Sequence, residues 1–306
     1  MKSRRRIIAS TWIALAFSGL LGGPAVGQTP EEATRRLWDT AFINPGKAHA
    51  TSKRRKPGAR SYRIATPNIS VAGVDGDTVV GVTVWRLRRS VPADTGERLI
   101  VHEGADEVEW LPERISANTK LVEGDRLRIS VEAARTGYLY VIDREQYADG
   151  SLGEPYLIFP TTRTLNGDNS VKVGKLIEIP AQDDAPPYFK VKRSKSDQVA
   201  EVLSVLVTPI PLADFQITDK AQKLSQAQVT TWENQWSTQM GWLEMENGAG
   251  KAWTREEKEA GGAGSDVLNA HAPSPQVIYY RPKAKSTEPM LVKVHLRYRP
   301  PAKATR

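Results

Sequence analysis

Three carboxylates and two tyrosines lie close together near the middle of the chain and are its best candidates for a reactive or binding site. The carboxylates are Glu145, Asp149 and Glu154, and the tyrosines are Tyr147 and Tyr156. Paired carboxylates can hydrolyse a glycosidic bond, one as a general acid and the other as a nucleophile or base. Aromatic rings beside a turn can instead form a platform for a sugar or a peptide. The stretch therefore predicts either a hydrolase acting through Glu145 and Asp149 or a binding surface at Tyr147, Asp149 and Tyr156.

Other reactive chemistry has little support in the residue types. The four histidines, His49, His102, His271 and His295, are far apart, and none forms the i, i+4 pair of a zinc protease helix. The sequence contains neither a Gly-x-Ser-x-Gly elbow nor a Gly-x-x-x-x-Gly-Lys-Ser/Thr phosphate loop. It has no cysteine, which excludes thiolate catalysis, disulfides and cysteine-ligated zinc. We therefore predict no catalytic residue, no metal and no cofactor.

Calcium is the one metal for which the chain offers oxygen ligands. The candidate ligands are either Asp143, Asp149, Asp183 and Asp184, or Asn166, Asp168 and Asn169. The same residue types form turns, particularly beside glycine. We favour the turn interpretation over a calcium site.

The N-terminus has the composition of an export signal. Lys2 and the arginines at 4–6 precede a mostly apolar run at 7–21, which is short for a bilayer span. Small residues at 25–27 predict cleavage before Gln28, so that residues 1–27 are a signal peptide. An uncleaved anchor is the alternative, and residues 3–8 partly resemble a twin-arginine signal. We expect a periplasmic or extracellular protein with no later transmembrane span.

The positive charge of the chain is concentrated in one short segment. The formal net charge is +8, and residues 47–63 carry seven basic side chains and no acidic one, including Lys53, Arg54, Arg55 and Lys56. This basic patch could hold an anionic partner, such as lipid headgroups or nucleic acid. It could instead be a solvated tether, which we favour, so residues 28–66 are predicted to be a basic flexible linker. Nucleic acid is not expected as a partner.

The elements that would position these residues are mostly strands. Residues 137–142 are apolar on both faces, which predicts a central strand covered on both sides. Residues 126–132 alternate apolar and polar side chains, which predicts a strand with one solvated face. Residues 290–298 are the most regular alternation in the chain, and we expect that strand to pair with the earlier sheet.

A helical pattern interrupts the strands. Leu224, Trp232, Trp236 and Met240 share one stripe, which predicts a helix over about 218–241 capped by Thr218 or Asp219. The sequence therefore predicts a mainly β fold, an antiparallel sandwich of Ig-like or jelly-roll type with a helical insertion near 218–260. We expect a single domain over 67–300, with a core module at 110–212, a helical excursion at 213–272 and returning strands at 276–299.

The order of several short motifs resembles an uncharacterised bacterial family, domain of unknown function 4384. The resemblance covers about residues 110–212, a third of the chain. It rests on Glu123-Gly124-Asp125, residues 137–142, Asp149-Gly150, residues 156–160, Asn169, Gly174 and Ile179-Pro180. It implies a β-sandwich of an exported or envelope-associated protein and transfers no catalytic residue. We therefore expect an exported, non-catalytic interaction module of the bacterial envelope that binds a protein or an envelope polymer. The alternative is an envelope hydrolase using Glu145 and Asp149.

Overall fold

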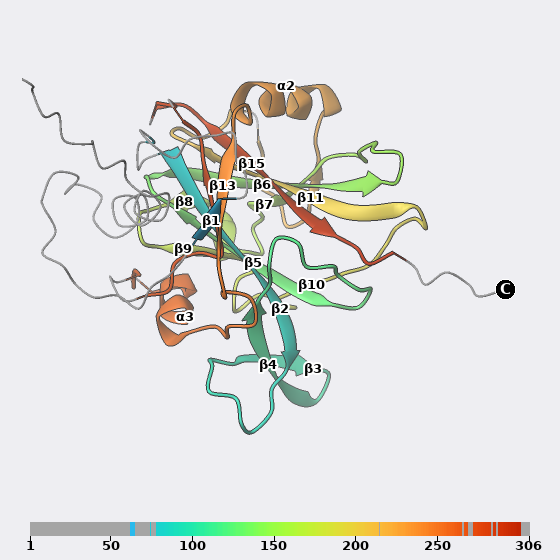
Figure 1. Cartoon of the computed structure of the whole chain (residues 1–306), viewed down its shortest axis with the longest axis vertical. Coiled ribbons are helices and arrows are strands. Elements are labelled where there is room, and N and C mark those ends of the chain that lie inside the picture. The colour runs from blue at the N-terminus through green and yellow to red at the C-terminus, as the bar shows by residue number, and fades with distance from the viewer. Residues whose placement is uncertain are drawn as a thin grey trace, which may run out of the picture.

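A computed structural model describes residues 62–64, 74, 78–213, 215–264, 266–268, 272–282, 284–285 and 287–300. The predicted signal peptide at 1–27 and the basic patch at Lys53–Lys56 lie outside the described residues. Two antiparallel sheets and two α-helices make up the described part (Figure 1), so the prediction of a mainly β fold with a helical insertion is confirmed.

The first sheet has nine strands, in the order β1-β13-β14-β2-β4-β3; β5 also pairs with β2, and β9 and β10 pair with β5. The long strand β2 lies at the centre of this sheet. Along one edge, its first half pairs with β14 and its second half pairs with β4, and its other edge pairs with β5. The strand bounds are β1 Tyr62–Ile64, β2 Val79–Arg89, β3 Leu99–Glu103, β4 Asp106–Arg114, β5 Arg126–Ala133, β9 Leu176–Ile179, β10 Phe189–Lys190, β13 Gly241–Met245 and β14 Val277–Tyr280.

The second sheet has six strands, in the order β12-β7-β6-β11-β15, with β8 beside β6. Its strands are β6 Gly137–Tyr147, β7 Tyr156–Phe159, β8 Ser170–Val171, β11 Gln198–Thr208, β12 Gln222–Lys223 and β15 Met290–Arg297. The central strand expected at 137–142 is β6, which pairs with β7 and β11. The expected pairing of the last strand is also confirmed, because β15 pairs with β11 over its whole length.

The main core lies between the inward faces of these two sheets. Val82 of β2 and Val131 of β5 belong to the same apolar cluster as Val141 of β6, Val205 of β11 and Val292 of β15. All five side chains are nearly inaccessible to solvent. β-Branched residues suit this position, since they pack well on a pleated surface.

Helix α2, Gln226–Trp236, covers the outer face of the second sheet (Figure 1). Trp232 packs in a cluster with Tyr140 and Leu206 and stacks on Trp236 at 5.8 Å between ring centroids. The helix is shorter than the predicted 218–241 and begins after Ser225, whose hydroxyl caps it. The preceding residues Gln222 and Lys223 form strand β12, so Thr218 and Asp219 do not cap the helix.

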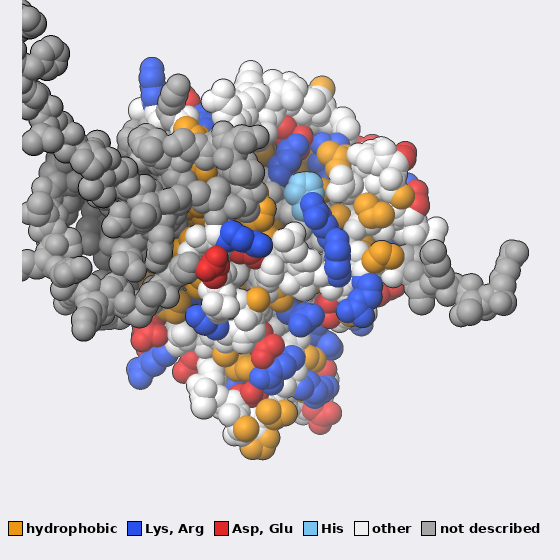
Figure 2. All heavy atoms as spheres, in the orientation of Figure 1, with side chains coloured by type: hydrophobic (Ala, Val, Ile, Leu, Met, Phe, Trp, Pro, Cys, Tyr) orange, Lys and Arg blue, Asp and Glu red, His pale blue; other side chains and the backbone are white. Residues whose placement is uncertain are grey.

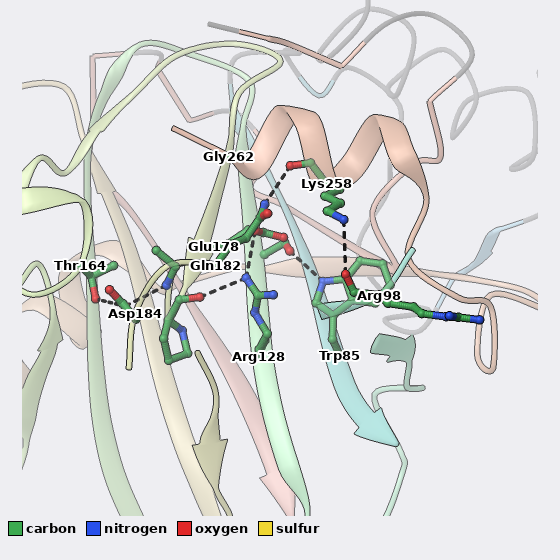
Figure 3. Close-up of polar contacts among 12 residues, drawn as sticks. Trp85, Arg98, Arg128, Thr164, Glu178, Gln182, Asp184, Lys258 and Gly262 are labelled. Carbon is green, nitrogen blue, oxygen red and sulfur yellow. Dashed lines mark hydrogen bonds and ion pairs between the residues drawn. The ribbon is translucent and has the colours of Figure 1, made fainter. Parts of the chain in front are cut away.

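Helix α3, Arg255–Gly261, lies near β9 and covers polar residues of the first sheet. The prediction of a solvated face on β5 is wrong, because Arg128, Ser130 and Glu132 are all almost fully buried. Figure 3 shows Arg128, Glu178 and Gln182 pointing toward one another below the helix that carries Lys258. Arg128 Nη2 donates to Glu178 Oε2 at 2.9 Å, so the polar side chains pair with one another rather than with water.

Two further findings modify the expected organisation. Tyr62–Ile64, the end of the predicted linker, form strand β1, and Tyr62 is buried with its hydroxyl donating to Pro275 O at 2.8 Å. The predicted helical excursion contributes strand β13 to the first sheet. Within the described residues, no helix has both the length and the hydropathy needed to cross a membrane.

Candidate functional site

The predicted tyrosine and carboxylate residues lie around the hairpin that joins β6 to β7. The Tyr147 hydroxyl donates a hydrogen bond to Glu145 Oε2, and the Lys195 ammonium lies 4.5 Å from the centre of the Tyr147 ring. The hydrogen bond to Glu145 raises the pKa of Tyr147. Tyr156, the cross-strand partner of Asp143, is 43% exposed. The hairpin thus presents one tyrosine to solvent and holds the other in a local polar contact.

Asp149 has a structural role in the turn of this hairpin. Its Oδ1 accepts hydrogen bonds from Ser151 N at 2.9 Å and from Ser151 Oγ at 2.6 Å. These bonds hold the pKa of Asp149 below its usual value. The two carboxylates therefore have different hydrogen-bond partners, Ser151 for Asp149 and Tyr147 for Glu145.

A larger feature is the inter-sheet groove, a cavity of about 330 Å³ between β15 and the facing strands of the first sheet. Its floor is apolar and combines residues that are distant in sequence. One wall comes from β15, and the other from β2, β13, β14 and the segment at 115–121. The apolar lining consists of Val82, Val84, Ile115, Ala117, Leu121, Met240, Trp242, Val277, Tyr279, Val294 and Leu296.

The rim of the groove carries basic side chains. Lys293, His295 and Arg297 alternate along β15, and none of the described residues that line the groove is acidic. Figure 2 shows lysine and arginine side chains beside a histidine on one face of the molecule. Lys293 donates to Glu233 Oε2 at 2.7 Å, whereas Arg297 has no acidic partner among the described residues. Burial, followed by the charges of Arg297 and Lys293, lowers the pKa of His295.

Strand β15 is also the outer strand of its sheet. Leu121 N donates to Arg297 O at 2.8 Å and Arg299 N donates to Leu121 O at 2.7 Å, on the side away from β11. Because successive residues of a strand point their main-chain groups to opposite sides, those of Lys293 and His295 also point away from β11. No described strand pairs with them there. The groove therefore combines an apolar floor, a rim with basic side chains and a sheet edge that no described strand covers.

Only one wall of this groove, the strand at 290–298, can be predicted from the sequence. The alternation at 290–298 predicts the strand and places His295 on its more polar face, and the spacing of Lys293, His295 and Arg297 could have marked a cationic row. The facing wall could not be found in the same way, because Ala117, Trp242 and Tyr279 come from separate segments.

Several sequence candidates stay apart from the groove or outside the structure. The basic patch, His49 and His271 are not among the described residues. Within the described part, no group of three or more histidine and acidic side chains is arranged to hold a metal ion. Comparisons with protein-family models, with curated proteins and with solved structures found no match. The resemblance of residues 110–212 to a domain-of-unknown-function family therefore stays a prediction.

Proposed function

We propose that this chain is an exported, non-catalytic binding module whose inter-sheet groove takes an extended protein segment with apolar and acidic side chains. The observation that carries the proposal is the open edge of β15 beside an apolar cavity of about 330 Å³. An extended peptide can add a strand to such an edge, gaining affinity from main-chain hydrogen bonds and specificity from alternate side chains.

The two faces of β15 define what the added strand should carry. Val294 and Leu296 face the core side, where the groove is apolar, and Lys293, His295 and Arg297 lie on the other face. Side chains of a paired strand lie on the same face as their cross-strand partners. A complementary segment therefore alternates an apolar residue over the groove with an acidic residue beside the cationic row.

The test is a binding measurement with a designed peptide. The probe is an end-capped, fluorescent octapeptide of alternating valine and glutamate, titrated into the purified chain and followed by anisotropy. We expect saturable binding that weakens as salt is raised, since exposed charges are screened. A peptide of alternating valine and lysine should bind at least tenfold more weakly, and equal binding of the two peptides would contradict the proposal.

Two variants locate the interaction. Arg297→Glu should weaken binding of the valine-glutamate peptide at least tenfold, because it reverses the charge that has no acidic partner in the described structure. His295→Pro should also weaken it, because proline removes an N–H that the added strand would use and outer strands tolerate proline. Lys172→Glu is the matched control, an exposed residue outside the groove that should leave binding unchanged. Circular dichroism checks that each variant is folded.

A further inference from the structure

A second cavity, of about 180 Å³, lies between the sheets and contains two acidic side chains. Its apolar walls come from both sheets, and the carboxylates of Asp143 on β6 and Glu201 on β11 line it. Lys190 and Lys192 stand at its solvent-exposed side. The apolar lining consists of Leu121, Leu127, Ile129, Ile158, Phe189, Val191, Leu203 and Leu296.

Each carboxylate has a buried oxygen without a hydrogen-bond partner. These atoms are Asp143 Oδ1 and Glu201 Oε2, both inaccessible to solvent. The other oxygen of Glu201 is engaged, because Tyr298 Oη donates to it at 2.8 Å and Gln198 Nε2 donates at 2.6 Å. Buried polar atoms normally have a partner, so two orphaned oxygens lining one cavity indicate a missing donor.

The register of the second sheet explains why the carboxylates gather there. Glu201 lies directly opposite Glu145, and Asp143 lies opposite Leu203, two residues further along β11. Side chains at these positions share one face of the sheet and are close neighbours. Like charges so placed repel, which favours a compensating cation.

The surrounding residues do not supply that cation. Lys190 and Lys192 form no ion pair with either carboxylate among the described contacts, and Arg193 instead lies over the Tyr298 ring at 5.2 Å. Burial, the charge of Glu201 and the charge of Glu145 raise the pKa of Asp143 to about 8. Burial also raises the pKa of Glu201. Near neutral pH Asp143 therefore retains a proton that a bound cation could displace.

We propose that this cavity is a binding site for a primary alkylammonium group, with the ammonium between Asp143 and Glu201 and the alkyl chain along the apolar walls. An ammonium supplies three N–H donors, which matches two orphaned acceptors better than a single-donor group does. Calcium needs six to eight oxygen ligands, far more than this apolar cavity supplies. The inference is independent of the peptide groove, which shares only Leu121 and Leu296 with this cavity.

Calorimetric titration with n-butylammonium chloride tests the proposal, with n-butanol as the neutral probe of the same shape. We expect n-butylammonium to bind and n-butanol to bind at least tenfold more weakly. Binding should be tighter at pH 9 than at pH 6, because the ammonium needs ionised carboxylates. Near pH 8 it should release protons, which is measured by repeating the titration in buffers with different heats of ionisation.

Variants separate this site from general attraction to an acidic surface. Asp143→Asn and Glu201→Gln keep the shape of the side chains and should each lower the affinity at least tenfold. Glu154→Gln, an exposed residue paired with Lys223 outside the cavity, is the matched control and should have no effect. Thermal unfolding confirms that each variant is folded.

Four outcomes would overturn the proposal. The first three are no heat of binding at pH 9, unchanged affinity in both cavity variants, and tighter binding of calcium chloride that is lost in the same variants. The third result would assign the cavity to a divalent cation instead. Equal binding of n-butanol and n-butylammonium would likewise show that the carboxylates play no part.

Discussion

Charged residues buried below helix α3 show how individual side chains depend on one another in this protein. Arg114 forms an ion pair with Glu257, and Arg128 forms one with Glu178, with all four side chains at most 4% exposed. Glu132 lies among them, and its Oε1 has no hydrogen-bond partner. Burial, followed by the charge of Glu257, raises the pKa of Glu132 well above its usual value. Glu132 is therefore the member of this cluster that the surrounding contacts stabilise least as an anion.

Replacing Glu132 with glutamine should make stability less dependent on pH. The folded state keeps a proton on Glu132 at pH values where the unfolded chain has lost it, so the free energy of unfolding falls as pH rises above about 4.3. A glutamine at position 132 does not ionise, so the variant lacks this pH dependence. From pH 5 to pH 8 the variant should become progressively more stable relative to the wild type, by at most about 1.4 kcal/mol for each pH unit.

Urea unfolding at pH 5, 6, 7 and 8 measures this difference. The exposed Glu154→Gln is the control and should follow the wild type at every pH. A constant offset between Glu132→Gln and the wild type would show that Glu132 is ionised in the folded protein across this range.

Strand β5 and the carboxylates at 145–154 show how much of a polar cluster can be predicted from one sequence. The polar alternation of β5 is visible in the sequence, but its burial is not, because Glu178, the partner of Arg128, lies 50 residues away. Likewise, the carboxylates of residues 145–154 stand out by their proximity in sequence, yet Glu145 lies opposite Glu201 on the neighbouring strand. Asp149, which is nearer in sequence, has a separate role in a turn. Pairings across a sheet depend on register, which local patterns do not provide.

At the scale of elements, the seven-residue helix α3 depends on its cap. The Thr254 hydroxyl accepts from Glu257 N at 3.3 Å, and the Glu257 carboxylate accepts from Thr254 N at 3.1 Å, which forms a capping box. Glu257 also pairs with Arg114, so the cap and the attachment to the sheet share one side chain. Short helices are marginal alone, and this arrangement compensates for that weakness.

Replacing Thr254 with alanine should lower the free energy of unfolding by about 1 kcal/mol, the usual cost of losing a helix cap. Thr231→Ala in α2 is the matched control, because Thr231 is exposed within a helix and alanine is the better helix former. It should leave stability unchanged or raise it slightly. Chemical denaturation of both variants makes the comparison, and equal losses would show that the cap at Thr254 adds nothing specific.

Element boundaries were harder to predict than element types. The stripe of Leu224, Trp232, Trp236 and Met240 correctly indicates a helix, but only Trp232 and Trp236 lie within α2. Leu224 is buried beside the helix, and its N donates to Pro155 O at 2.9 Å. The apolar stripe therefore extends beyond the helix, in part because Leu224 is buried outside it.

For the whole molecule, the arrangement of strands joins distant parts of the sequence in one core. Strand β15 near the C-terminus pairs with β11, while β13 and β14 pair alongside β2 in the other sheet. Residues from β2, β5, β6, β11, β14 and β15 all contribute to the cluster between the sheets. The sequence predicts only part of this arrangement. The alternation at 290–298 indicates a strand that returns to the sheet, but it does not show that the strand pairs with β11.

A shared core predicts that both sheets unfold together. Leu139→Ala removes a side chain that is 0% exposed in the inter-sheet cluster, and it should cost about 2–5 kcal/mol. Ile100→Ala on β3, where the side chain is 52% exposed, is the control and should change stability by less than about 0.5 kcal/mol. Tryptophan fluorescence and far-ultraviolet circular dichroism should give the same single transition for wild type and for Leu139→Ala. Because Leu139 lies between the sheets, separate transitions in the two signals would show that the sheets are independently stable.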